Sequence, residues 1–138
     1  MTNDSAYNER LFKGGIRAWI HLSRFRWLEK KCRQYQPALD LVLELGCFDA
    51  RSLNYLGGLP EKYYGFDANW EGGLDLARQE YQNKNYHFID CMEPNGMSID
   101  KQMATLSISL ETLEHIPQDL LDKYVRKLSE ITNGYVFV

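Results

Sequence analysis

Long apolar runs are missing from this sequence of 138 residues. No stretch reaches the roughly eighteen apolar residues that a transmembrane helix needs. The first twenty residues mix acidic and basic side chains with apolar ones, which is unlike a secretory signal. The cytoplasm is therefore the expected compartment. With 44% hydrophobic and 25% charged residues, the chain predicts one globular core.

Grouped cysteines and histidines are missing as well. Cys32, Cys47 and Cys91 are odd in number, far apart and outside any CxxC arrangement, which argues against a disulfide framework and against a zinc site. The three histidines are equally scattered along the chain. We therefore expect no metal centre.

The net charge is only −3, but basic residues are concentrated near the amino terminus. Residues 1–33 hold eight Lys or Arg against three acids, whereas residues 34–138 hold eight against sixteen. Apolar residues between Leu11 and Tyr35 recur at roughly helical spacing, which predicts one or two amphipathic helices broken near Gly14 and Gly15. We divide the chain into a basic helical arm, 1–36, and a domain, 37–138. A solvated basic face explains the arm better than an acidic partner does, and nucleic acid is not expected to bind.

Beyond Pro37, short apolar runs alternate with helical patterns. Strands are predicted at 41–45, 63–66, 86–89, 104–110 and 135–138, and helices at 50–56, 74–81 and from Pro117 to a stop at Asn133-Gly134. This alternation predicts an α/β fold with a mainly parallel sheet and helices on both of its faces. In such sheets ligands bind beyond the carboxyl ends of the strands.

The residues after the first two predicted strands indicate a nucleotide-like ligand. Gly46 opens the first strand-to-helix turn, and Asp67 follows twenty-one residues later, about where an acid meets a ribose in a βαβ unit. A dinucleotide site would need further glycines where Phe48 and Arg51 stand. Glu44 and Asp49 flank the turn and disfavour a pyrophosphate, but they suit a cationic ligand such as S-adenosylmethionine (SAM), which carries an ammonium and a sulfonium.

Four segments resemble motifs of the class I SAM-dependent methyltransferases. LVLELGCFDARSL resembles the first motif, YYGFDAN the second and FIDCME the third, while LSISLETLEHIP is similar to the fourth-strand segment of the small-molecule branch. The resemblance covers about residues 38–138. It implies a Rossmann-like three-layer sandwich with strand order 3-2-1-4-5, SAM as cofactor, and methyl transfer to a small-molecule or glycan-type acceptor.

The resemblance also implies a role for each residue of the motifs. Glu44 would help to hold the methionine part of SAM, which Glu111 would border through its backbone. The turn is expected to contact the cofactor through Gly46, Cys47 and Phe48.

Asp67, with Ala68 beside it, would bind the ribose, although a helix cap would also explain an acid there. Asp90 would bind the adenine amino group with Cys91 and Met92 against the ring, although a turn residue would look the same. His115 is the candidate base for a hydroxyl acceptor. The family commonly has glycine where this chain has Phe48 and Ala50.

Two other functions and one structural question stay open. A catalytically inactive SAM-binding regulatory or partner module would carry the same motifs, and the missing glycines disfavour a nicotinamide-dependent oxidoreductase. In similar methyltransferases the amino-terminal segment folds over the cofactor, as Tyr7 to Phe25 would do here. Similar methyltransferases also continue to a sixth and a seventh strand, which this sequence lacks. The segment 135–138 would then be an edge strand with unpaired backbone groups. Either the chain is the front part of a longer protein, or two copies form a homodimer through this edge or the helices beside it.

Overall fold

A five-stranded sheet forms the centre of the molecule in the computed structural model, which describes residues 15–69 and 71–138. The strand order is β3-β2-β1-β4-β5, and every neighbouring pair is parallel. The order and the parallel pairing predicted from the sequence are therefore confirmed. The strands are β1 (Leu41–Leu45), β2 (Lys62–Asp67), β3 (Tyr86–Asp90), β4 (Ala104–Ile108) and β5 (Thr132–Phe137).

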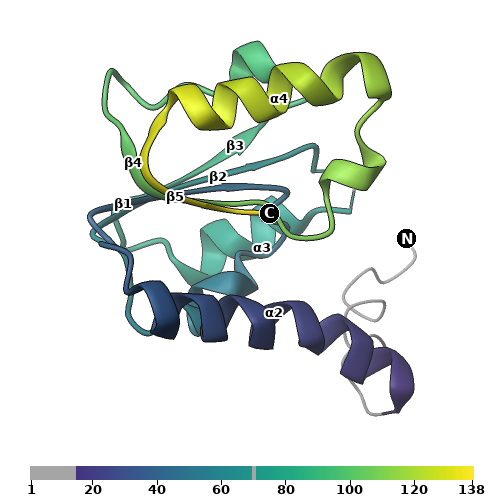
Figure 1. The fold of residues 1–138 in the computed structure, drawn as a ribbon. Helices are drawn as coiled ribbons and strands as arrows, with labels where there is room; N and C mark the ends of the chain where they lie inside the picture. The colour runs from purple at the N-terminus through teal and green to yellow at the C-terminus, as the bar shows by residue number, and fades with distance from the viewer. Residues whose placement is uncertain (1–14, 70) are drawn as a thin grey trace.

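Helices cover both faces of the sheet, so the fold has three layers (Figure 1). One face carries α2 (Ile16–Tyr35) and α3 (Gly73–Glu80), and the other carries α4 (Gln118–Glu130). Three short 3-10 helices lie in the connections, namely η1 (Arg51–Tyr55), η2 (Pro94–Gly96) and η3 (Leu113–His115). The short helix expected at 50–56 thus exists, but in the tighter 3-10 form.

Strand β1, apolar except for Glu44, lies at the centre of the sheet. Val42 packs with Leu28 of α2 on one face, while Leu43 packs with Tyr124 and Leu128 of α4 on the other. Because both faces of a parallel sheet are covered, all five residues of β1 are buried.

The described part of the amino-terminal arm is one continuous helix. It begins after Gly15, whose φ of 92° is a conformation that favours glycine, and it continues to Tyr35 without a break. Its Leu28 and Cys32 are buried in the core between α2 and the sheet. The predicted arm residues 1–14 lie outside the described residues. None of the described helices has the length and apolarity required to cross a membrane.

The predicted boundary between the last helix and the last strand is wrong. Asn133 and Gly134 were expected to stop the helix, yet α4 ends at Glu130 and both residues belong to β5. A Cβ at Gly134 would lie 1.9 Å from the carbonyl oxygen of Thr105. The glycine therefore serves the close approach of β5 to β4 rather than a turn. Strand β4 also ends earlier than predicted, at Ile108 rather than Leu110.

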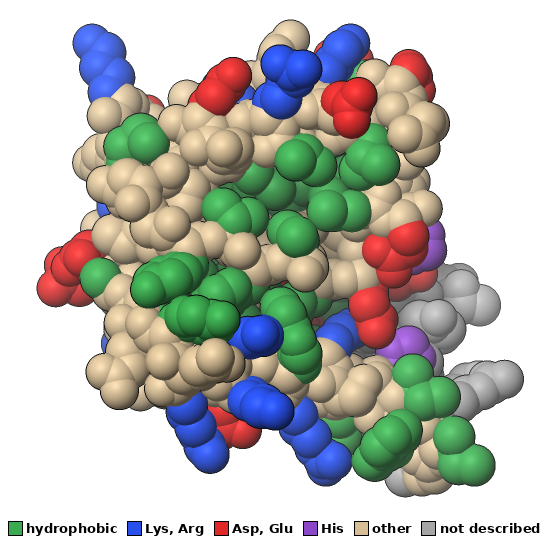
Figure 2. Space-filling view, in the orientation of Figure 1, with side chains coloured by type: hydrophobic (Ala, Val, Ile, Leu, Met, Phe, Trp, Pro, Cys, Tyr) green, Lys and Arg blue, Asp and Glu red, His purple; other side chains and the backbone are tan. Residues whose placement is uncertain are grey.

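Apolar side chains gather on the face that runs from α4 across β5 to α2 (Figure 2). Tyr35 of α2 contacts both Tyr135 and Phe137, with ring centroids 5.4 and 6.0 Å apart, and Trp27 meets Phe137 at 6.1 Å. Val136 remains 41% exposed on the same strand. Within the described residues β5 pairs only with β4, so the predicted edge position of this strand is confirmed.

Candidate functional site

The carboxyl ends of the parallel strands meet at one edge of the sheet, and the loop after β1 meets the loop after β4 there. Gly46 has a φ of 75°, and its N–H donates to the carbonyl of Phe66 at 2.7 Å. A Cβ on Gly46 would lie 1.9 Å from Oγ1 of Thr112. Position 46 therefore requires glycine for two reasons: its φ is in the left-handed region, and Thr112 packs where a Cβ would lie. The sequence did not indicate this role of Thr112.

The two residues that replace the family's glycines keep a glycine-like backbone. Phe48 has a φ of 49° and Ala50 a φ of 57°, both in the left-handed region. For residues with a side chain this conformation costs about 1–2 kcal/mol each. Such strain is concentrated at functional sites, where the surrounding structure enforces it. The turn therefore follows a glycine-like path although its sequence departs from the motif.

Asp67 joins the ends of β1 and β2. Its Oδ2 accepts a hydrogen bond from the N–H of Phe48 at 3.0 Å, and its Oδ1 accepts one from the N–H of Asn69 at 2.9 Å. An ionised carboxylate has about four acceptor positions, so each oxygen retains one for a ligand. Ala68, the next residue, is half-buried at the same strand end.

Asn69 continues this loop into α3 and allows a first test of the site's architecture. Its φ is 54°, which asparagine tolerates, and its Oδ1 accepts the N–H of Leu74 at 3.2 Å. Asn69→Ala loses this cap and strains the backbone, so the free energy of unfolding in urea should fall by about 1 kcal/mol. The same change at the exposed Asn54 is the control and should have a smaller effect. Equal effects at the two positions would contradict the capping role.

Glu44 lies inside the protein rather than on the surface of the site. Its side chain is 3% exposed, and its Oε2 accepts hydrogen bonds from the hydroxyls of Ser52 and Tyr63, the second at 2.6 Å. Burial raises the pKa of Glu44 to about 7, and the negative charge of Asp49 adds to this rise. The two hydrogen bonds and the positive charge of Arg24 act in the opposite direction. A contact between Glu44 and the methionine part of SAM stays a prediction.

The end of β3 lies beside Asp67, with Asp90 as its register partner. Asp90 is exposed and Met92 is 57% exposed, so both side chains are accessible to a ligand. Cys91 differs, because its thiol packs in the core under α4 and donates to the carbonyl of Glu93 at 3.0 Å. Its N–H donates to the carbonyl of Asp67 at 2.9 Å, which fixes the two strand ends together.

The other cysteine of the predicted site also points into the core. Cys47 is 4% exposed, and a Cβ on Gly65 would lie 2.7 Å from its Sγ. Burial raises the pKa of the Cys47 thiol well above its usual value, with contributions from the charges of Glu44 and Asp67. What Cys47 offers to a ligand at the turn is therefore its backbone.

The segment after β4 connects the site to the amino-terminal helix. Glu111, with a φ of 49°, forms an ion pair with Arg24 of α2, and Nδ1 of His21 lies 3.9 Å from the same carboxylate oxygen. From the sequence, Arg24 was expected on a basic face of the arm that is solvated rather than bound to an acidic partner, so this contact was missed. His115 is 75% exposed and lies 3.9 Å from Glu114, and its role as a base stays a prediction.

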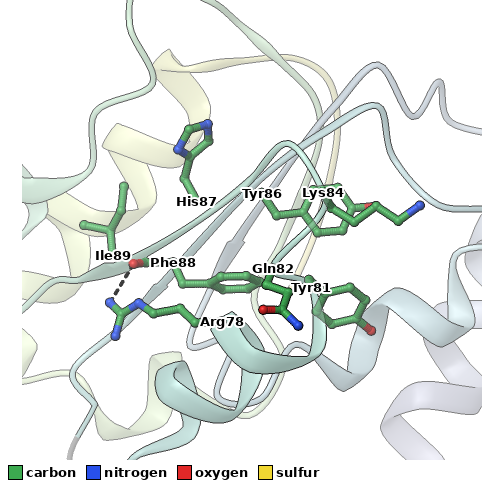
Figure 3. A pocket seen from close by; sticks show the side chains of 8 residues that line it. All are labelled: Arg78, Tyr81, Gln82, Lys84, Tyr86, His87, Phe88 and Ile89. Atoms are coloured by element: carbon green, nitrogen blue, oxygen red, sulfur yellow. Dashed lines mark hydrogen bonds between the residues drawn. The ribbon is translucent and has the colours of Figure 1, made fainter.

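A shallow hollow of about 380 Å³ lies elsewhere, along the outer edge of β3 (Figure 3). Arg78, Tyr81 and Tyr86 are among the residues that line it, and Arg78 donates a hydrogen bond to the carbonyl of Phe88 at 2.7 Å. None of the residues predicted for the site lines it. Among the described residues no group of three His, Cys, Asp or Glu side chains could hold a metal ion.

Comparisons with known proteins identify the fold. No protein-family model matches the sequence, and a search of curated proteins gave no match. A SAM-dependent methyltransferase from Clostridium acetobutylicum is 20% identical with a TM-score of 0.73, over 98% of this chain and 57% of that one. Magnesium protoporphyrin IX methyltransferase from Synechocystis, solved with SAM, is 17% identical with a TM-score of 0.67, over 96% and 67% of the chains.

A third similar structure is the N-methyltransferase NodS from Bradyrhizobium japonicum in complex with S-adenosylhomocysteine (SAH). It is 15% identical with a TM-score of 0.67, over 99% of this chain and 72% of that one. The chain thus spans 57% to 72% of the length of these three proteins. At this level of identity the similarity shows the fold, which is the Rossmann-like fold of SAM-dependent methyltransferases.

Proposed function

We propose that this chain binds SAM across the carboxyl ends of β1, β2 and β3 and transfers its methyl group to a small-molecule acceptor. The observation that carries the proposal is the junction of Asp67 with the turn after β1, where the carboxylate accepts the N–H of Phe48 at 3.0 Å. In this proposal the carboxylate of Asp67, beside a turn with glycine-like backbone, accepts the ribose diol. The similar solved structures that contain SAM or SAH support the same cofactor.

The charges at this edge favour SAM over a dinucleotide. Asp49, Asp67 and Asp90 belong to the ends of β2 and β3 or to the turn after β1. Carboxylates attract the ammonium and sulfonium of SAM, whereas a pyrophosphate would be repelled. In this proposal Asp67 binds the ribose, Asp90 the adenine amino group, and the backbone of the turn lies against the methionine part.

The reaction needs little chemistry from the side chains. SAM, when bound, would supply an electrophilic methyl group to the acceptor's lone pair, with the sulfur as the leaving group. The contribution of the protein is then mainly to hold the acceptor in line with the methyl group. A hydroxyl acceptor must also lose its proton, and His115 is the candidate base.

The test is to measure binding and transfer separately. Titration calorimetry should give a heat of binding for SAM and SAH and none for NADH. Methyl-labelled SAM, incubated with small-molecule and glycan-type acceptors, should then release SAH in the presence of one class of acceptor. Binding without transfer to any acceptor would favour the inactive module, and binding of NADH alone would contradict the proposal. The cytoplasmic location and the homodimer through β5 stay predictions.

A further inference from the structure

We propose that the side of α2 that is turned away from the sheet binds an anionic lipid surface, with its apolar side chains among the headgroups and its lysines and arginines on the phosphates. The proposal does not depend on the proposed function, because lipid binding needs no cofactor. From the sequence, a solvated basic face was expected on this arm. The structure places exposed apolar side chains on the same face, and solvation alone does not account for them.

Helix α2 has apolar side chains on two opposite sides. One side is buried against the rest of the protein and consists of Ala18, Phe25, Leu28 and Cys32. On the opposite side, four apolar side chains are between 37% and 79% exposed, namely Trp27, Ile20, Trp19 and Ile16. The spacings within this second set are three, four and seven residues, so its members share one side of the helix over a length of about 16 Å. We call this set the outer stripe.

The outer stripe is part of a larger apolar surface. Single exposed apolar residues are ordinary on a protein, but a contiguous set marks a place of interaction. Trp27 connects the stripe to β5, since its ring meets Phe137 at 6.1 Å, and Tyr135 and Val136 of that strand are themselves exposed. Figure 2 shows hydrophobic side chains both at the amino-terminal end of α2 and over β5, with lysines and arginines along the helix.

The charges beside the outer stripe favour an anionic partner. Helix α2 contains six Lys or Arg and one acid, Glu29, whose carboxylate pairs with Arg33 at 2.7 Å. Helical geometry places Arg26 and Lys30 on one flank of the stripe and Lys31 on the other. The ammonium of Lys31 lies 5.6 Å from the centre of the Trp27 ring. Because residues 34–138 hold sixteen acids against eight Lys or Arg, the basic surface is concentrated on this helix.

An apolar centre between two basic flanks is the pattern of a helix that lies in the plane of a membrane. Aliphatic and indole groups enter the boundary between headgroups and acyl chains, while Lys and Arg extend to the phosphates. A nucleic acid would bind the cations but would leave Ile16 and Ile20 in water. The amino-terminal half of α2 also projects beyond the sheet, as contact with a flat surface requires (Figure 1). The observations therefore favour a lipid surface.

Co-sedimentation of the whole chain with lipid vesicles tests the proposal. The wild type should bind vesicles of phosphatidylcholine that contain about 30% phosphatidylglycerol, whose negative surface attracts basic side chains. Binding to vesicles of phosphatidylcholine alone should be at least tenfold weaker, because that surface carries no net charge. Added salt should release part of the bound protein, since it screens the charges but not the apolar contacts.

Two double variants remove the apolar and the basic contributions separately. They are Trp19→Gln with Ile20→Gln, and Arg26→Gln with Lys30→Gln. Each should weaken binding to the anionic vesicles at least tenfold. All four positions are exposed and glutamine is a good helix former, so the melting temperature should stay near that of the wild type. The matched controls change exposed residues of α3 and α4 and should bind like the wild type; they are Leu76→Gln with Val125→Gln, and Lys123→Gln with Arg126→Gln.

Four results would overturn the inference. The first is a wild type that does not sediment with the anionic vesicles. The second is full binding by the variant of Trp19 and Ile20, which would show adsorption by charge alone. The third is an equal loss of binding in the control variants, which would show that no particular face of the protein is used. The fourth is a dimer in light scattering that the variant of Trp19 and Ile20 abolishes, without binding to vesicles, because a second copy would then cover the outer stripe.

Discussion

Asp67→Ala should weaken SAH binding by at least about 100-fold. A ribose diol bound to a carboxylate makes two charge-assisted hydrogen bonds, each worth about 1.5–3 kcal/mol, and about 1.4 kcal/mol corresponds to a factor of ten in affinity. Calorimetric titration of SAH into the variant measures the loss directly. An affinity equal to that of the wild type would contradict the ribose assignment.

Two further variants separate the ligand contact from the structural role of Asp67. Asp67 also holds the N–H groups of Phe48 and Asn69, so the alanine variant loses both of those bonds. Asp67→Asn retains an acceptor oxygen and should stay closer to the wild-type melting temperature while still losing most of the affinity. Asp100→Asn removes the same charge before β4, at the opposite edge of the sheet, and should leave SAH binding unchanged.

Glu44→Gln should change the pH dependence of stability by about 3 kcal/mol. Burial raises the pKa of Glu44 from an ordinary 4.5 to about 7 in the folded chain, so between these pH values the folded state binds more protons than the unfolded state. The free energy of unfolding of the wild type therefore falls as the pH rises from about 4.5 to 7. Each pKa unit corresponds to about 1.4 kcal/mol. Glutamine does not ionise and avoids this loss.

Urea unfolding at pH 4.5 and pH 7.5 measures the difference between the two proteins. The advantage of Glu44→Gln over the wild type should grow between the two pH values, because only the wild type must ionise a buried carboxyl. Glu61→Gln, at an exposed position outside the core, is the matched control and should show no such growth. A constant difference between Glu44→Gln and the wild type would show that Glu44 ionises freely in the folded protein.

The sequence predicted the sheet well because its signals are local. Each strand is a short apolar run, and helical patterns separate the runs, so the parallel topology followed from alternation. The boundary at Asn133 and Gly134 was mistaken, because the same pair of residues serves a turn in most settings and a close strand contact here. The carbonyl of Thr105, which requires Gly134, is distant in sequence and could not be read from the local pattern.

The site was predicted less completely, because its geometry depends on contacts between distant segments. Asp67 and Gly46 were predicted from their spacing, but the packing of Thr112 on Gly46 joins two strand ends that only the fold brings together. The pair of Arg24 and Glu111 spans 87 residues. The sequence did not show that the turn keeps a glycine-like backbone with Phe48 and Ala50 in place of glycine. The surrounding structure imposes the left-handed backbone of these two residues.

Hydrogen exchange with and without SAH tests most directly that the cofactor site lies at the carboxyl ends of the strands. At saturating SAH, backbone amides in residues 46–50, 67–69 and 90–92 should exchange more slowly, because the ligand covers these loops and restricts their opening. Amides around the hollow at the outer edge of β3, residues 81–89, should exchange at their unliganded rates. Slower exchange confined to residues 81–89, or no change anywhere at saturating SAH, would contradict the account.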